Sequence, residues 1–598
     1  MKTQHSFNHN WLPTTKKEVE LLGWDDLDVI IFSGDAYVDH PSFGPSVIGR
    51  VIEAEGLKVA IVPQPNWQDD LRDFRKLGKP KYFFGVTAGN MDSMVNHYTA
   101  TRRLRSDDAY TPGGKAGFRP DYPTVVYTKI LKKIFPDVPV IIGGIEASMR
   151  RLTHYDYWKD KLEPSILLTS GADLLIYGMG EEPIRELIRL LKKGISFTSL
   201  KTVAQTSVVI KKEEPLPEQK IWKDISLNSF EKCVKDKNSF SENFVKFEKE
   251  SNKIISARLN EVSGDLKVIV NPPFAPMGKD EIDRSFDLPY MFLPHPRYNK
   301  KENIPAYEMI KFSVNIHRGC FGGCSFCAIA SHQGKQIMSR SEQSIINEIA
   351  KISKLPDFKG YLTDLGGPSA NMYLMGGRDM KLCQTCSRPS CIWPAVCKNL
   401  NTSHKELTEL YRRVDRLEGI KKSFVGSGVR YDLLFPEWNQ NAGRDEGEYL
   451  EELVRNHVSG RLKVAPEHTS SHVLSIMRKV PFDLFRKFKK RFDGIRTKND
   501  LKCEMIPYFI SGHPGCTDAD MKELEGEVKS MGIKPEQVQD FTPTPMTLST
   551  LIYYTGFDPY TGKKVYVARS LEEKRRQKEY FFWYRKKPLL NKRIRNKQ

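Results

Sequence analysis

Cysteine is scarce in this sequence, and long apolar runs are absent. The 598 residues include ten cysteines, too few for a disulfide scaffold of this length, so metal binding or catalysis in a reducing compartment explains them better. No apolar run reaches the roughly 18–20 residues that a membrane helix needs. Residues 1–13 are polar and contain no apolar signal segment. These absences predict a cytoplasmic protein with no membrane partner.

Two common nucleotide-binding motifs are missing as well. The sequence has neither a GxxxxGK[ST] phosphate loop nor a complete GxGxxG fingerprint. A hydrophobic share of 39% with 11% aromatics excludes a largely disordered or fibrous chain, and the length favours about three or four domains. The net charge of +19 would ordinarily indicate nucleic acid or another anionic partner.

Short apolar runs alternate with helical patterns over the first 205 residues. Continuous apolar runs are typical of strands buried on both faces, and strands separated by helices form parallel βαβ units. We therefore expect an N-terminal doubly wound parallel sheet, a Rossmann-like α/β domain over residues 1–205, with ligands beyond the carboxyl ends of its strands. The predicted strands are 27–33, 58–62, 81–86, 138–142 and 173–177, and glycine-containing turns follow three of them at 33–35, 143–146 and 178–181.

The rest of the chain is predicted to divide into three parts. Residues 206–305 are expected to be a connecting segment with some helix, because residues 211–253 within it are rich in Lys, Glu, Ser and Asn. Residues 306–545 contain six predicted strands separated by helices, too few for a closed eight-stranded barrel, so we expect a partial (βα)6 TIM-type barrel. Residues 546–598 form a basic, aromatic C-terminal extension. The six strands are predicted at 309–316, 359–365, 421–426, 461–465, 502–510 and 537–541.

Three cysteines in the spacing C-x3-C-x2-C follow the first of these six strands: Cys320, Cys324 and Cys327. Three thiolates in one short loop can hold three irons of a cubane [4Fe–4S] cluster and leave the fourth iron open to a substrate or cofactor. Gly322 and Gly323 allow the loop to wrap closely around such a group. Structural zinc is the alternative, with a fourth ligand from His317 or His332.

This motif, with Phe326 just before its last cysteine, resembles that of the radical S-adenosylmethionine (radical SAM) superfamily. The longer string 312–340, FSVNIHRGCFGGCSFCAIASHQGKQIMSR, is similar more narrowly to the YgiQ-type family. The resemblance covers most of the chain and is weakest over residues 211–255 and the last 25 residues. Other matching segments are 34–44, 141–151, 171–182, 364–372 and 537–547.

The resemblance implies a cofactor set and a mechanism. The three cysteines would ligate a [4Fe–4S] cluster, and its open iron would bind the amino and carboxylate groups of S-adenosylmethionine (SAM). The reduced cluster would cleave SAM, and a 5′-deoxyadenosyl radical would take a hydrogen from a substrate that the sequence does not identify. The protein's part is to position that radical and to exclude water. A low-potential electron donor of the flavodoxin or ferredoxin type is the implied partner.

Residues after the other predicted strands are further candidates for this site. Superfamily members often carry Gly-Gly-Glu after the second strand to hold the SAM amino group, and here the glycines match but the acid is replaced by proline. Gly366, Gly367 and Arg430 are therefore the predicted SAM-binding residues, Arg430 through a two-pronged bond to a carboxylate. Candidates to move protons are Glu467, His468 and His513. Each of these residues is alternatively an ordinary polar turn residue.

A second group of cysteines lies in an insertion, residues 366–403, between the second strand and the next helix: Cys383, Cys386, Cys391 and Cys397. Four thiols so close in sequence suffice for a tetrahedral zinc site or an auxiliary iron–sulfur cluster. We expect a metal here and favour a cluster over zinc. A set of free thiols in a packed loop is the alternative.

Two further features bear on cofactors and partners. The N-terminal domain resembles, in topology, the cobalamin-binding domains of some superfamily members, but residues 39–44 (DHPSFG) have the letters of their DxHxxG motif at the wrong spacing. Cobalamin is therefore the less favoured cofactor. Residues 574–598 hold eleven Lys or Arg against one acid, Glu579, interleaved with aromatics. That composition suits RNA, although a packed aromatic helix followed by a solvated basic tail is favoured.

The leading prediction is thus a radical SAM enzyme acting on an unidentified substrate. One alternative is a non-catalytic iron–sulfur or zinc protein that binds nucleic acid through its basic tail. Another is a radical SAM enzyme that modifies RNA. Formation of 5′-deoxyadenosine from SAM separates the first prediction from the non-catalytic alternative.

Overall fold

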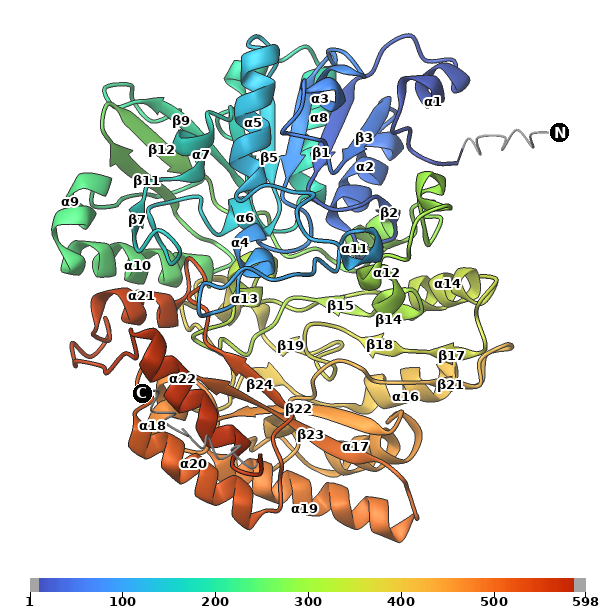
Figure 1. Cartoon of the computed structure of the whole chain (residues 1–598), viewed down its shortest axis with the longest axis vertical. Coiled ribbons are helices and arrows are strands. Elements are labelled where there is room, and N and C mark those ends of the chain that lie inside the picture. Colours follow the sequence, from blue (N-terminus) through green and yellow to red (C-terminus); the bar gives the residue numbers. More distant parts are fainter. Residues whose placement is uncertain (1–9, 586–598) are drawn as a thin grey trace, which may run out of the picture.

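The computed structural model describes residues 10–585 and shows two stacked parts (Figure 1). The first half of the chain, blue to green, forms a large sheet flanked by helices in the upper part of the view. The second half, yellow to red, lies below it and carries smaller groups of parallel strands. Along residues 10–585, no helix is long and apolar enough to cross a membrane.

Five neighbouring strands of the large sheet are parallel, in the order β3–β1–β4–β5–β8. In chain order this is 2-1-3-4-5, a doubly wound arrangement, so the predicted parallel sheet is confirmed. Helices α2 (Gly44–Ala54) and α8 (Glu181–Lys192) pack together, as do α5 (Pro123–Ile134) and α7 (Ile166–Ser170). The strands are β1 (Val29–Ser33), β3 (Val59–Pro63), β4 (Phe83–Thr87), β5 (Val140–Gly143) and β8 (Leu174–Ile176).

The sheet continues through four strands of the segment that was predicted to be a connection. β9 lies antiparallel beside β8, and β12, β11 and β10 follow outward. The expected helix is present as α9 (Phe230–Lys235) and α10 (Lys237–Ser251), but the strands were missed. Polar residues, several of them buried and hydrogen-bonded, interrupt the apolar runs of these strands. They are β9 (Thr206–Lys211), β10 (Asp224–Ser226), β11 (Arg258–Ser263) and β12 (Leu266–Val270).

Glu261 on β11 is a buried carboxyl, 2% exposed, held by Thr153 N at 2.8 Å and Asn243 Nδ2 at 3.4 Å. Burial raises its pKa to about 7. Because this folded-state pKa lies above the ordinary value, the group's contribution to stability is lost as pH rises through about 7. Glu261→Gln is expected to remove up to about 3 kcal/mol of that pH dependence. Urea unfolding between pH 4.5 and 8 measures it, and identical pH profiles for the two proteins would contradict the expectation.

Parallel strands recur in the second half at the six predicted positions. β14 pairs with β18, β17 with β21, β22 with β23 and β23 with β24, all in parallel. Hydrogen bonds from Leu365 N to Phe424 O (2.8 Å) and from Val425 N to His457 O (2.9 Å) connect neighbouring segments. The strands are β14 (Ser313–Asn315), β17 (Tyr361–Leu362), β18 (Asp364–Gly366), β21 (Lys422–Ser423), β22 (Arg461–Glu467), β23 (Glu504–Ser511) and β24 (Gln537–Asp540). The helices between them are α14 (Glu342–Ile352), α16 (Lys405–Val414), α17 (Arg444–Asn456), α18 (Ser471–Ile476), α19 (Phe482–Lys498) and α20 (Asp518–Ser530).

The first part of the basic C-terminal segment packs against the protein. Lys574 on α22 (Leu571–Glu579) is 4% exposed, and its Nζ lies 2.7 Å from Tyr157 Oη and 3.2 Å from Tyr553 Oη. Phe581 is fully buried. These two side chains are therefore structural, as the packed alternative expected. Residues 586–598 lie outside the described residues, so RNA binding through 574–598 stays a prediction.

Candidate active site at the cysteine loop

The cysteine loop, residues 319–328, lies between β15 (His317–Arg318) and α13 (Ile329–Gln333). At its base β15 pairs antiparallel with β16 (Met338–Ser339). Cys320 N donates to Gly334 O at 3.2 Å, and Ser325 N donates to Met477 O at 3.0 Å. The loop is thus fixed to segments far apart in the sequence, which orients its thiols.

The three thiols of the cysteine loop are half-buried and influence one another's ionisation. Burial raises the pKa of Cys320 and raises that of Cys327 to about 12, and the neighbouring thiols act in the same direction. Arg430 opposes this effect, because its Nη1 lies 3.5 Å from Cys324 Sγ and its charge lowers the pKa of Cys320. Thiolates formed on metal binding would therefore face a guanidinium, an electropositive setting typical of functional cysteines.

Two glycines let the backbone lie directly against these thiols. A Cβ on Gly322 would lie 3.3 Å from Cys320 Sγ and 3.1 Å from Arg430 Nη1. Gly323 has a φ of +61°, and a Cβ there would lie 2.2 Å from Pro389 O. Among residues 10–585 no three Cys, His, Asp or Glu side chains converge on a single metal ion, but a cubane places its thiolates on separate irons. The three-thiol donor set and the glycine cradle fit such a cluster.

Gly366 and Gly367 lie at the end of β18, beside the loop. Asp364 Oδ1 accepts from Gly426 N at 2.9 Å and so ties this strand end to the next segment. Gly367 packs on the ring of His317, since a Cβ would lie 2.5 Å from His317 Cε1. The structure thus gives a packing reason for the second glycine, and its SAM-binding role stays a prediction.

Gly367→Ala is expected to displace the His317 ring and to destabilise the protein by about 1–3 kcal/mol through overpacking. The matched control is Gly376→Ala in the same insertion, where a Cβ would meet nothing within 4 Å. Thermal unfolding of the two variants compares them. Equal melting temperatures would contradict the expected displacement.

Glu467, the last residue of β22, also lies near the cysteine loop. Its φ of +70° is unusual for a residue other than glycine, and such strain tends to occur at functional sites. The side chain is 8% exposed, with Oε1 3.8 Å from Lys479 Nζ. Burial raises its pKa, the charge of Arg430 lowers it, and its own charge raises the pKa of Cys327. Arg430 and Glu467 are therefore both brought into electrostatic contact with the loop.

His468 and His513 are held by internal hydrogen bonds. His468 Nδ1 accepts from Ser470 N at 3.0 Å, and its Nε2 lies 3.4 Å from Cys516 Sγ. His513 Nε2 lies 2.7 Å from the hydroxyl of Ser549 and its Nδ1 2.8 Å from Pro514 O. Burial lowers their pKa values to about 4 and about 3, so both rings are neutral near pH 7. Since each ring nitrogen already has a neighbour, this geometry favours a supporting role over proton transfer.

A cavity of about 570 Å³ lies between the large sheet and the cysteine loop. The sheet contributes turns at the carboxyl ends of its strands, including Gly89, Gly144 and Gly178. The second half contributes residues on either side of the loop: His317, Ala328 and His332. A volume in this range suits a small-molecule ligand. The predicted glycine turns and residues that flank the three cysteines therefore border one cavity.

The polar groups at this cavity are neutral or paired. His317 is fully buried, and neither of its ring nitrogens has a hydrogen-bond partner among residues 10–585. Burial lowers the pKa of His317 to about 3, despite a weak opposing contact with the Ser369 backbone, and lowers that of His332 to about 4. Arg318 forms a buried ion pair with Glu181. The sequence suggested these histidines only as zinc ligands, because the sheet that encloses them comes from the distant N-terminal half.

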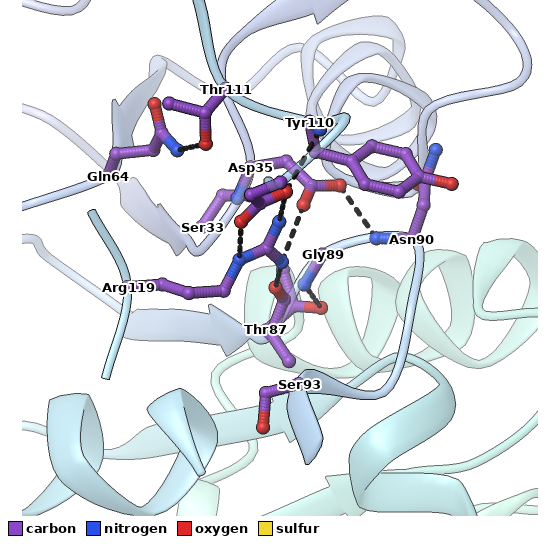
Figure 2. Close-up of polar contacts among 12 residues, drawn as sticks. Ser33, Asp35, Gln64, Thr87, Gly89, Asn90, Ser93, Tyr110, Thr111 and Arg119 are labelled. Atoms are coloured by element: carbon purple, nitrogen blue, oxygen red, sulfur yellow. Dashed lines mark hydrogen bonds and ion pairs between the residues drawn. The ribbon is translucent and has the colours of Figure 1, made fainter. Parts of the chain in front are cut away.

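A buried ion network supports the sheet side of the cavity (Figure 2). Arg119 Nη1 lies 2.8 Å from Asp35 Oδ1, and its Nε and Nη2 each donate to Asp108 at 2.8 Å. Asp35 Oδ2 accepts from Asn90 N at 2.7 Å, and Asn90 lines the cavity. Burial raises the pKa of Asp35 to about 6. The network sits where β1 and β4 end, at the switch point where doubly wound sheets bind ligands.

Residues 39–44, the segment compared with the cobalamin motif, hold the Asp39 and His40 side chains in internal contacts. Asp39 is buried in an ion pair with Arg50, and His40 packs against Phe292 with ring centroids 5.4 Å apart. His40 Nδ1 accepts from Ser42 N at 3.1 Å. These contacts place the His40 ring in the protein core, although Ser42 itself lines the cavity.

Comparisons with known proteins identify the family. The family model described as Radical SAM N-terminal matches residues 11–313, and one described as a domain of unknown function (DUF3362) matches residues 536–595. A UPF0313 protein of Bacteroides thetaiotaomicron is 59% identical over 97% of this chain and 96% of its own length. A UPF0313 protein of Methanocella arvoryzae is 46% identical over 94% of this chain and 91% of its own length.

Two solved structures show a distant likeness. The radical SAM methyltransferase TsrM from Kitasatospora setae, with cobalamin and a [4Fe–4S] cluster bound, has a TM-score of 0.48 at 13% identity and covers 92% of this chain and 90% of its own. The cobalamin-dependent SAM radical enzyme OxsB has a TM-score of 0.48 at 11% identity and covers 92% of this chain and 58% of its own. Neither likeness is close enough to assign a cofactor. The sequence relatives and the family model show that the chain belongs to the UPF0313 family of the radical SAM superfamily.

Proposed function

We propose that this chain is a radical SAM enzyme whose cluster-binding loop faces a substrate in the cavity beneath the large sheet. The observation that carries the proposal is the glycine-lined loop with three half-buried thiols beside Arg430. The six parallel strand positions support a partial (βα)6 barrel over residues 306–545 as the catalytic domain. A [4Fe–4S] cluster on Cys320, Cys324 and Cys327 would supply, when bound, the reductive cleavage of SAM.

The protein's own residues would bind, orient and shield the reacting groups. Arg430 balances thiolate charge, and its Nε donates to Asp432 Oδ1 at 3.1 Å, which fixes the guanidinium. Gly366 and Gly367 offer backbone at the strand end for the SAM amino group. Glu467 is the proton-holding candidate, because burial raises its pKa and the carboxyl lies near the loop.

The cavity favours an uncharged substrate. His317 is neutral and lines the cavity, and its ring nitrogens have no hydrogen-bond partner among residues 10–585, so they are available to a neutral polar group of a ligand. The Arg318–Glu181 pair cancels its own charge. A charged ligand would lose its hydration without a free counter-charge from these residues, which is costly. Cobalamin stays the less favoured occupant, since His40 lies in the core.

Anaerobic reconstitution with iron and sulfide tests the proposed function. The expected results are a broad absorption near about 400 nm that dithionite bleaches, and 5′-deoxyadenosine formed from added SAM. A bleachable absorption without 5′-deoxyadenosine would favour the non-catalytic iron–sulfur alternative. Absence of both signals would contradict the cluster assignment.

A further inference from the structure

The insertion at residues 366–403 packs directly on the cysteine loop. Cys391 N donates to Phe321 O at 3.0 Å, and Ser390 Oγ donates to Gly322 O at 2.7 Å. Both groups of cysteines contribute to one apolar cluster, in which Cys320, Cys391 and Cys397 pack against Phe321, Met372, Met375, Ile392, Leu400 and Leu433. The insertion therefore holds its thiols beside the first site and not at a remote surface.

The four thiols of the insertion are half-buried and none of them is in a disulfide. The backbone folds them together, since Cys386 N donates to Cys383 O at 3.3 Å and Cys397 N to Cys391 O at 2.7 Å. Asn399 Nδ2 lies 3.5 Å from Cys383 Sγ, which brings Cys383 beside the residues that directly follow Cys397. β19 (Gly376–Gly377) and β20 (Leu400–Asn401) close the base of the insertion. The insertion thus holds the four thiols in one compact segment whose two ends pair with each other.

A buried lysine points at these thiols. Lys335 is 4% exposed; its Nζ lies 3.9 Å from Cys386 Sγ and donates to Arg388 O at 2.9 Å. A buried ammonium is costly unless an anion balances it. The Cys386 thiol beside this ammonium can become anionic, so the site suits negative charge.

Asn399 and Gly377 fix one of the thiols. Asn399 Nδ2 lies 3.5 Å from Cys383 Sγ, and a Cβ on Gly377 would lie 2.5 Å from that sulfur. Donors to sulfur and a close backbone are the contacts that tune thiolate-bound metal centres. The surroundings of Cys383 are therefore those expected of a metal-binding cysteine.

We propose that Cys383, Cys386, Cys391 and Cys397 bind a second iron–sulfur cluster, adjacent to the cysteine loop and charge-balanced by Lys335. On binding, each thiol releases its proton to solvent and coordinates iron as a thiolate. A cubane suits thiols that do not converge on one ion, as is the case among residues 10–585. The second cluster does not depend on the proposed function of the first site.

Metal analysis of the full chain purified without oxygen tests this proposal. The variant with Cys320, Cys324 and Cys327 all replaced by alanine is expected to keep about four iron and four sulfide per chain. Replacing the four insertion cysteines instead should leave the iron of the first cluster and remove the iron and sulfide of the second. Cys503→Ala, outside both groups, is the control and should change neither. A triple variant that holds no iron, or holds one zinc in its place, overturns the proposal.

Lys335→Met provides a second readout in the triple-alanine background. Loss of a positive charge disfavours the reduced, more negative cluster, so its midpoint potential should shift to a more negative value. The control is Lys398→Met, a substitution of an exposed lysine within the insertion at residues 366–403. It should leave the midpoint potential unchanged. Equal potentials in the two variants would overturn the charge-balancing role of Lys335, and EPR-monitored redox titration makes the measurement.

Discussion

Cys324→Ala is expected to lower 5′-deoxyadenosine formation by at least about two orders of magnitude. Loss of a residue that merely supports a metal ligand often costs about 10–100-fold, so loss of a ligand should reach or exceed the upper end of that range. The variant also leaves Arg430 Nη1 without the sulfur 3.5 Å away. Rates of SAM cleavage and iron content are measured together on protein reconstituted without oxygen.

Two controls make this result specific to the cysteine loop. Cys503→Ala removes a thiol just before β23 and should retain wild-type cleavage. Cys386→Ala touches the insertion only and should leave SAM cleavage measurable. If Cys386→Ala abolished cleavage while Cys324→Ala did not, the two cysteine groups would have been assigned to the wrong roles.

Local sequence patterns predicted the strands whose residues are apolar throughout. The run LDVIIFS at 27–33 gave β1, because a strand covered on both faces needs apolar residues throughout. β9, with its sequence TSVVIK, was not recognised, because it begins with two polar residues, Thr206 and Ser207, although both are fully buried. The difference lies in how buried polar groups are satisfied: the Thr206 hydroxyl donates to Val203 O at 2.7 Å, a contact that the local sequence pattern does not show.

The cysteine loop was predictable from spacing, but its surroundings were not. Three thiols within eight residues must lie near one another whatever the fold. Lys335 and Arg430 approach the thiols only through tertiary packing, and sequence spacing carries no signal for such contacts. The same reasoning applies to His513, whose partner Ser549 also bonds the hydroxyl of Ser325 at 2.8 Å. That chain of contacts places His513 behind the loop, which its position after a strand did not reveal.

Arg119→Met is expected to destabilise the large sheet by about 3–5 kcal/mol. The Arg119 guanidinium, fully buried, is the cation between Asp35 and Asp108. Its removal leaves two buried carboxyls without that charge, and breaking one side of a buried pair costs more than the pair itself contributes. Hydrogen exchange of the amides on β1 and β4 measures the local opening free energy without requiring two-state unfolding of the whole chain.

The pH dependence of the stability that Arg119→Met loses distinguishes lost charge pairing from lost packing. Burial already raises the pKa of Asp35 to about 6, and the Arg119 charge opposes that rise. Without Arg119 the folded-state pKa rises further, so the carboxyl is protonated on folding and the variant loses more stability as pH increases. The deficit should therefore be larger at pH 8 than at pH 5. Arg72→Met, which breaks the exposed pair with Asp70 (side chains 80% and 60% exposed), should leave the stability essentially unchanged at both pH values. Two results would contradict the expected role of the network at the ends of β1 and β4. One is a loss of stability in Arg119→Met as small as that in Arg72→Met, and the other is a loss that does not change with pH.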